Sequence, residues 1–469
     1  MIKNKYKNLI FNIMELIALI AFFVIFIFND NMNSHLLCLL PLCNFIFMGL
    51  YSYSSCNRDI KIGSLIIIGS YFVRLTSTPL LMQLGSYFRR TSINLNYDKA
   101  IIYMIYEYVI VMIIMLILNE KFKKRKIIYE YYSSNKMKVN LPVNVIIIFL
   151  TAISIIFVYK YPGILSYFRI GFLNENETNQ WYINFYKAKK EVPTIPYYLI
   201  TWTLTLLRYI YVYMIIISLK NSNVRGKMFY SLIVIFASLM ITTSTLSDSL
   251  YFAIIYIMLL MELYKEKYDT LIKTLAVCLI IVVGIGLFYM SVIRHNDDNI
   301  FYTMSRTCMA YFSGIDNIAN ALEIDNYNTF ELIKGDFLRS LPLIKGFFVN
   351  LTRTDTIFNQ YIGDVYESQI TPTLGQSYIY FGTILSPLLS CIFTIMTIVF
   401  ENELDKEKRF DKRFLMYLLI IRCACVPVMY NAHIFLIGIF NSWVPLIALF
   451  ALNNKRREDG GKNESINIL

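Results

Sequence analysis

The chain has 469 residues, of which 57% are hydrophobic and 16% charged, and its mean hydropathy is +0.52. A soluble domain carries roughly a quarter charged residues, so this composition excludes a soluble enzyme with one anchor and predicts a single polytopic membrane domain. The net charge of +12 would suit a nucleic-acid-binding protein, but the basic residues cluster in short segments between apolar runs, which is how membrane proteins are oriented. No nucleic-acid partner is expected.

The apolar residues come in runs that match the roughly 20 residues of helix needed to cross a bilayer core. About twelve transmembrane helices are expected, over residues 9–29, 35–54, 63–84, 100–119, 143–162, 195–219, 228–242, 249–264, 270–293, 374–400, 414–430 and 433–452. The helices expected over 228–242 and 249–264 are short. As an alternative, the two form a broken hairpin that does not reach the far face of the membrane. The sequence thus predicts an all-α integral membrane protein, with residues 1–453 as one domain.

The distribution of lysine and arginine predicts the orientation. Three lysines precede the first helix, and no small-residue cleavage site follows it, so this helix is expected to be retained. When the helices alternate in direction, the basic clusters 121–126, 406–413 and 455–457 fall on the same side as these lysines. Because positive residues stay inside, both termini and the polar tail 454–469 are expected in the cytoplasm.

Two long segments then face outward, over residues 163–194 and 294–372. Loops of this length are uncommon and usually functional. Within the second loop, Phe330–Asn350 has apolar residues at helical spacing, and Pro342 is expected to divide that stretch. The loop is therefore predicted to carry short amphipathic helices that lie on the outer membrane surface.

Three arginines fall within the apolar helices, at Arg74, Arg208 and Arg422. Each costs a few kcal/mol to insert, so such a side chain usually faces a cavity or a partner. Arg74 and Arg208 are predicted to bind substrate within one outward-open cavity, with an internal ion pair to Glu107 or Glu15 as the alternative. Arg422 is interpreted more simply as a side chain that snorkels to the inner face.

The densest polar cluster is Arg294-His-Asn-Asp-Asp-Asn299, at the start of the second outer loop. His295, Asp297 and Asp298 are side chains that can accept a hydroxyl proton, and Arg294 can bind a diphosphate through two hydrogen bonds. The alternative is a solvated C-terminal helix turn. Three further loop arginines are predicted to contribute to substrate binding: Arg306, Arg339 and Arg353. No phosphate loop, H-E-x-x-H or D-x-D motif is present, so no cofactor and no metal are expected.

The stretch Thr371-Pro-Thr-Leu-Gly-Gln-Ser-Tyr-Ile-Tyr-Phe-Gly382 resembles the exit from the long outer loop in Wzy-type O-antigen and capsule repeat-unit polymerases. Tyr311-Phe-Ser-Gly314 is also similar to members of this family, as is the layout of helices around one large outer loop. The paired R-x10-G pattern of some members is absent from the outer loops, where Arg306 and Gly314 are too close. The family's catalytic residues are therefore not transferred by position.

The resemblance implies a membrane glycosyltransferase of the bacterial inner membrane. Its substrate would be an oligosaccharide on undecaprenyl diphosphate, and the growing glycan would be transferred to a new lipid-linked repeat. The outward-facing arginines and Tyr378, which lies in the matching stretch, would contact this substrate. The resemblance also implies the lipid bilayer and a chain-length regulator protein as partners. The alternatives are a lipid-linked oligosaccharide flippase, which has short loops on both faces, and an O-antigen ligase.

Overall fold

The computed structural model describes residues 4–28, 35–54, 61–87, 96–122, 141–167, 169–170, 180–181, 183–184, 187, 191–239, 241–242, 246–275, 299–324, 328–341, 345–363, 369–407 and 409–451. Over these ranges the chain is helical apart from one antiparallel pair of two-residue strands. Six segments are long and apolar enough to cross a membrane, over Asn8–Ile27, His35–Ser54, Ile62–Leu84, Tyr97–Lys121, Leu199–Asn221 and Ala432–Ala451. This confirms the all-α class and marks the chain as a membrane protein.

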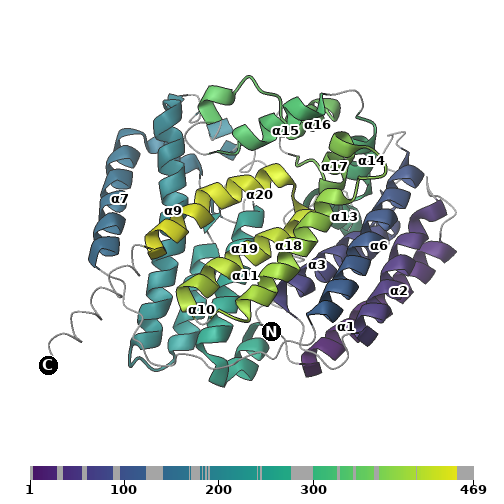
Figure 1. Cartoon of the computed structure of the whole chain (residues 1–469), viewed down its shortest axis with the longest axis horizontal. Coiled ribbons are helices and arrows are strands. Elements are labelled where there is room, and N and C mark those ends of the chain that lie inside the picture. The colour runs from purple at the N-terminus through teal and green to yellow at the C-terminus, as the bar shows by residue number, and fades with distance from the viewer. Residues whose placement is uncertain are drawn as a thin grey trace.

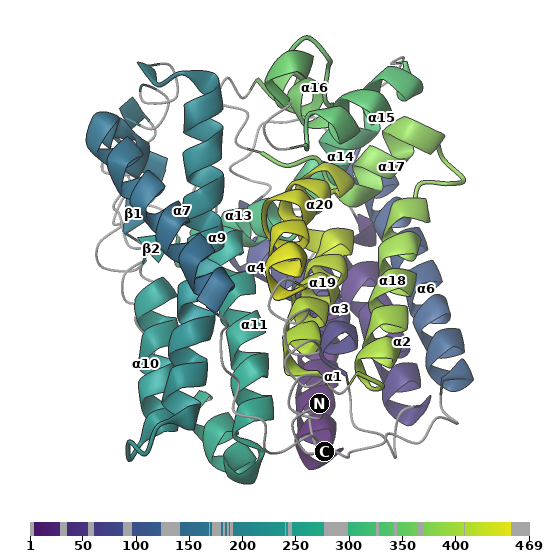
Figure 2. The ribbon, with the colours of Figure 1, turned by 60° about the vertical axis from the view of Figure 1, so that its left-hand side comes forward.

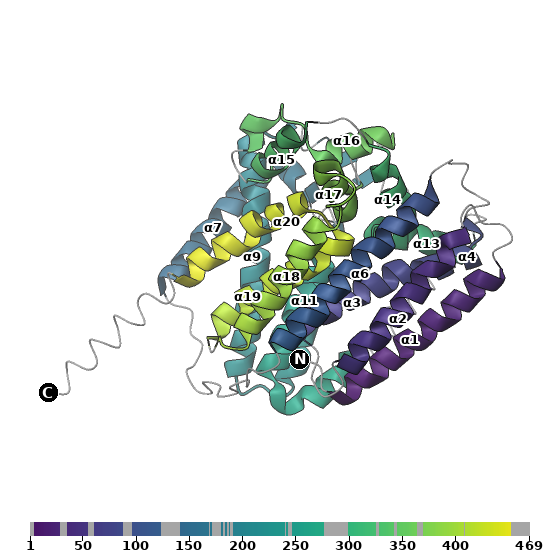
Figure 3. The same ribbon diagram turned by 45° about the vertical axis from the view of Figure 1, so that its right-hand side comes forward.

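The first helical group contains the N-terminal segments, which lie side by side (Figure 3). Its elements are α1 Asn4–Ile27, η1 His35–Cys38, α2 Leu39–Ser54, α3 Ile62–Phe72, η2 Val73–Ser77, α4 Thr78–Leu84 and α6 Tyr97–Lys121. From α3 to α4 the chain runs on as one helix, with a π-helical turn at η2. Such turns are rare and often occur at functional sites.

The second helical group follows in the chain (Figure 1). Its elements are α7 Leu141–Lys160, η3 Pro162–Tyr167, β1 Arg169–Ile170, α9 Thr194–Asn221, α10 Lys227–Leu239, β2 Ile241–Thr242, α11 Leu246–Leu263 and η4 Lys265–Lys267. The 13 residues of α10 span about 20 Å at 1.5 Å per residue, less than a bilayer core of about 30 Å. In Figure 2, α10 and α11 end below the level that α9 reaches, which is the geometry of the broken hairpin.

The remaining elements are α13 Ile300–Tyr311, α14 Ile315–Leu322, α15 Thr329–Leu338, η6 Lys345–Phe348, α16 Thr354–Tyr361, α17 Thr373–Phe381, α18 Leu388–Leu404, α19 Phe410–Met429, α20 Ala432–Gly438 and η7 Ile439–Trp443. The helices α13 to α16 are called the loop layer below. Figures 1 and 2 show α14, α15 and α16 gathered with α17 at the end of the bundle opposite the N-terminus, whereas α13 lies deeper, beside α4. The helix expected over 374–400 is divided, because Gly382 adopts a positive φ of 74° and Pro387 precedes α18.

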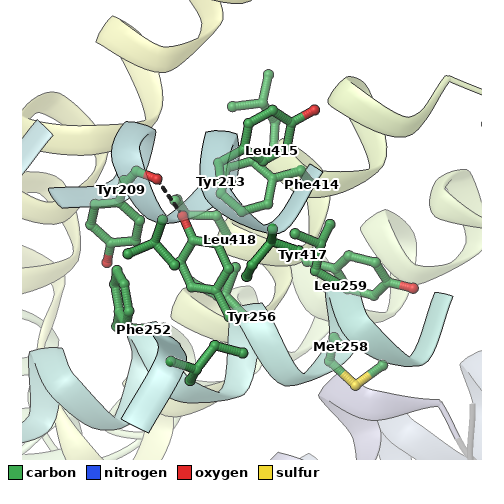
Figure 4. Packing of buried hydrophobic residues seen from close by; sticks show 14 of the residues in the cluster. Tyr209, Tyr213, Phe252, Tyr256, Met258, Leu259, Phe414, Leu415, Tyr417 and Leu418 are labelled. Atoms are coloured by element: carbon green, nitrogen blue, oxygen red, sulfur yellow. Dashed lines mark hydrogen bonds between the residues drawn. The ribbon is translucent and has the colours of Figure 1, made fainter. Parts of the chain in front are cut away.

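The helix α19 joins the two groups through its two faces. Ala424 and Val428 pack into the hydrophobic core of the first group, whereas Phe414 and Leu418 pack into that of the second. Figure 4 shows the aromatic centre of the second core, where Phe414 lies among tyrosines and a phenylalanine of α9 and α11. Since α19 ends below the loop layer, this packing positions the site described next.

Candidate functional site

The loop layer meets α17 and α20 at a buried polar junction whose centre is Asp336 of α15. The Asp336 carboxylate accepts hydrogen bonds from the Thr354 backbone nitrogen (3.0 Å), the Thr354 hydroxyl (2.6 Å) and the Gln376 amide (2.9 Å), and also from the Tyr380 hydroxyl. Its side chain is 4% exposed. A buried carboxylate requires such donors, so Asp336 ties α15, α16 and α17 together.

A second buried carboxylate, Asp355, lies at the start of α16. It accepts hydrogen bonds from the Thr371 backbone nitrogen (2.9 Å) and from the Asn431 amide (2.7 Å). Burial raises the pKa of the Asp355 carboxyl, and the neighbouring Arg353 guanidinium acts in the opposite direction. Together these contacts bind the loop layer to the segment that joins α19 to α20.

His433 in α20 completes the junction. Its Nδ1 lies 2.6 Å from the backbone oxygen of Asp336 and its Nε2 lies 3.4 Å from Nη1 of Arg353. A carbonyl oxygen only accepts, so Nδ1 carries the proton, and Nε2 is the acceptor that faces the guanidinium. His433 is 1% exposed, so these two contacts commit both ring nitrogens to positioning Arg353 and α15.

The backbone groups at the break between α19 and α20 are bound by side chains of the stretch Thr371–Gly382. The Gln376 side-chain oxygen accepts a hydrogen bond from the Ala432 backbone nitrogen (2.9 Å), and the Thr373 hydroxyl donates to the Val426 carbonyl (2.6 Å). Asn431 caps α20 by accepting from the Ile434 nitrogen (2.9 Å). Pro427 lies in the last turn of α19, and these bonds satisfy the backbone groups that the break leaves without helical partners.

A nearly buried arginine lies below this junction. Arg422 of α19 is 8% exposed, and its Nε has no hydrogen-bond partner. Its guanidinium carbon lies 5.4 Å from the ring centroid of Tyr251 in α11, and a Cβ on Gly438 would overlap the guanidinium. Tyr251 stacks in turn on Tyr430, with centroids 5.0 Å apart. Among the described residues, no carboxylate forms an ion pair with Arg422.

Arg208 reaches the same end of α11 from α9. Its guanidinium carbon lies 4.5 Å from the ring centroid of Phe252, the residue after Tyr251, and its Nη2 donates to the Ser238 carbonyl near the end of α10 (2.7 Å). Two arginines therefore stack on consecutive aromatic residues near the N-terminal end of an 18-residue helix. The two guanidinium groups give this region a positive charge, which favours an anion. From the sequence, Arg422 was expected to reach the inner face, whereas Arg208 was expected to bind substrate.

No family model, curated protein or solved structure matches this chain. The site must therefore be interpreted from its own residues. The junction carries two acids, a histidine and Arg353, each with at least one hydrogen bond within the junction, so it can orient the loop layer. The arginines at α11 carry positive charge near the tip of a short hairpin, so they can bind an anion.

Arg74 has the ion-pair arrangement that was the alternative to substrate binding. Its Nη1 lies 2.7 Å from a carboxylate oxygen of Glu107, and both side chains are fully buried. The other Glu107 oxygen accepts from the Ser390 hydroxyl. Arg74 packs in the core of the first group, whereas the neighbours of Arg208 belong to the core of the second. The structure thus does not bring the two arginines together.

The other predicted site residues are dispersed. Arg294, His295, Asp297 and Asp298 lie outside the described residues. Arg306 is exposed on α13, with its guanidinium carbon 6.0 Å from the Tyr302 ring. Arg339 Nη1 donates to the Leu351 carbonyl (2.9 Å), and Arg353 contacts His433. Tyr378 contacts the Tyr103 ring and the Lys99 ammonium. Of the predicted residues that the structure describes, only Arg353 takes part in the junction.

The buried pair of Arg74 and Glu107 yields a stability prediction. Arg74→Met alone leaves a carboxylate in the core without its counter-ion, so we expect the free energy of unfolding to fall by about 3–5 kcal/mol. Arg74→Met combined with Glu107→Leu removes both charges and should recover most of that loss. Thermal unfolding in detergent micelles measures both variants. A double variant as unstable as the single one would contradict a simple ion pair.

Proposed function

We propose that the chain is a membrane glycosyltransferase that polymerises undecaprenyl-diphosphate-linked oligosaccharide repeats for an O-antigen, capsule or exopolysaccharide. The observation that carries the proposal is Arg422, a nearly buried guanidinium without a carboxylate partner among the described residues. It lies below a junction built from the long loop and from the stretch Thr371–Gly382, which carries the resemblance to Wzy-type polymerases.

The proposal assigns a role to the charge of Arg422 and Arg208. Arg422 is nearly buried and forms no ion pair with a carboxylate of the described residues, which is costly in a membrane unless a substrate supplies the negative charge. A diphosphate leaving group supplies it, and two guanidinium groups beside the N-terminal end of α11 would stabilise the charge that develops as the glycosidic bond breaks. From Arg422 to Tyr430 the helix α19 rises about 12 Å, so the sugar of a lipid bound there would extend toward the loop layer.

The junction has a positioning role in this proposal. Asp336, Asp355 and His433 hold the loop layer over the bundle, and Arg353 at its edge faces the glycan. The proton acceptor for the attacking hydroxyl is sought in the segment Arg294–Asp298, because His295, Asp297 and Asp298 are side chains that can accept a hydroxyl proton.

The proposed topology has about twelve membrane-spanning helices and both termini in the cytoplasm of a bacterium. Residues 163–194 and 294–372 would face outward. Two exposed positions test this arrangement, namely Asn350 near η6 and Val224 between α9 and α10. A cysteine at 350 is expected to react with a membrane-impermeant maleimide on intact spheroplasts, and one at 224 only after the membrane is opened. Labelling of position 224 from outside would reverse the orientation.

The reaction itself is tested by reconstitution. Liposomes that contain the purified protein and lipid-linked repeats should produce glycan chains of many repeats on one lipid, with undecaprenyl diphosphate released. Mass spectrometry of the extracted lipids measures both products. Repeats that only exchange leaflets would identify a flippase, and transfer only to a lipid A acceptor would identify a ligase.

A further inference from the structure

The helix α15 exposes its apolar side chains. Phe330 is 75% exposed, Ile333 is 38% exposed and Phe337 is 47% exposed. The spacing of three and four residues places them on one face of the helix, and the exposed Lys334 lies on the same face. We call these four residues the aromatic stripe. A soluble surface rarely presents two phenylalanines and an isoleucine in one row.

The opposite face of α15 fixes this orientation. Asp336 and Gly335 are buried there, and Asp336 accepts the four hydrogen bonds of the junction. A Cβ on Gly335 would overlap the carbonyl of Thr352, so this face packs directly against the backbone of the segment before α16. The helix cannot turn its aromatic stripe inward without withdrawing Asp336 from its donors. The exposure of the stripe is therefore built into the fold.

The stripe is continuous with a membrane-facing surface. The ring of Phe337 lies 6.5 Å from that of Phe440, which belongs to the candidate membrane span Ala432–Ala451. Only 28% of that segment's apolar window is buried inside the protein, so most of it is left for lipid. Beyond α15, the exposed side chains of Phe347 (78%) and Val349 (60%) extend the apolar surface.

We propose that the aromatic stripe of α15 is seated in the bilayer surface, at the boundary between headgroups and acyl chains. Phenylalanine side chains insert at this depth, and a lysine on the same face reaches the lipid phosphates. Because the stripe and Asp336 lie on opposite faces of one short helix, contact with lipid and contact with the junction require the same orientation of α15. The bilayer thereby holds the loop layer in place over the bundle.

Photo-crosslinking tests this seating in the full chain. Benzoylphenylalanine is introduced at position 330, at position 347, at Ile148 of α7 as a lipid-facing reference, and at Glu331, which is exposed on α15 outside the stripe. After irradiation in liposomes of phosphatidylethanolamine and phosphatidylglycerol, positions 330 and 347 should form phospholipid adducts in yields close to that of position 148. Position 331 should give a yield several-fold lower. Intact-mass spectrometry counts the adducts.

Two outcomes overturn the proposal. Equal and low lipid yields at positions 330 and 331 would show that the stripe faces water, and adducts of 330 with a second copy of the chain would show that a protein surface covers it. Thermal unfolding of each variant verifies that the substituted chain is folded. No sugar substrate enters the experiment, so the result is independent of the proposed polymerase activity.

Discussion

Replacing Arg422 with methionine is expected to abolish polymer formation while the protein remains folded. The guanidinium is nearly buried and has no carboxylate partner among the described residues, so its removal leaves no opposite charge stranded. Methionine has a similar length and no charge to desolvate. The free energy of unfolding should stay the same or rise by about 1–2 kcal/mol, whereas loss of a donor to the leaving diphosphate should lower the rate about 100- to 1,000-fold.

The same helix offers a matched control for this variant. Arg413 donates to both carboxylate oxygens of Glu262 (Nε at 3.0 Å from each) and to the backbone carbonyl of Glu407 (2.9 Å). Arg413→Met leaves the nearly buried Glu262 carboxylate without its counter-ion and should lower the free energy of unfolding by about 3 kcal/mol or more. Chain-length analysis of the product and thermal unfolding of both variants separate the two roles. An Arg422→Met protein that is active, or that is as unstable as Arg413→Met, would make Arg422 a structural residue.

Asp336→Ala is expected to detach α15 and α16 from α17. The change leaves the Thr354 backbone nitrogen and the Gln376 amide without their acceptor, and it also removes the acceptor of the Tyr380 hydroxyl. Each stranded buried donor costs about 1–3 kcal/mol, so we expect a local loss of more than about 3 kcal/mol. Polymer formation should fall with it, because Arg353 and His433 lose their support.

Limited proteolysis measures this local effect. Trypsin should cleave the Asp336→Ala protein at Lys334, Arg339 or Arg353 much faster than the unaltered chain, while the transmembrane core stays resistant. Glu331→Ala is the control, because this residue is an exposed carboxylate on the same helix. If Asp336→Ala and Glu331→Ala were cleaved at the same rate, the junction would not be what holds the loop layer.

The sequence pattern did not predict which acidic side chains of the outer loop are buried. Phe330–Asn350 was predicted to be helical and divided near Pro342, and the structure has α15 and η6 on either side of residues 342–344. The pattern also predicts that the amphipathic helices of this loop lie on the outer membrane surface. Which face of α15 is exposed depended on Asp336, whose donors come from residues 18 to 44 positions away. Long-range hydrogen bonds of this kind leave no local periodicity.

Composition and the length of the apolar runs by themselves determined the all-α membrane class, since crossing a bilayer requires long apolar helices. The six long segments agree closely with the expected ranges. Only the tertiary structure decided which charges are paired. The sequence predicted substrate binding for Arg74 and an inner-face position for Arg422, but in the structure Glu107 forms an ion pair with Arg74 and no described carboxylate forms one with Arg422. Pairing depends on which helices touch and at what height, and one helix's sequence does not contain that information.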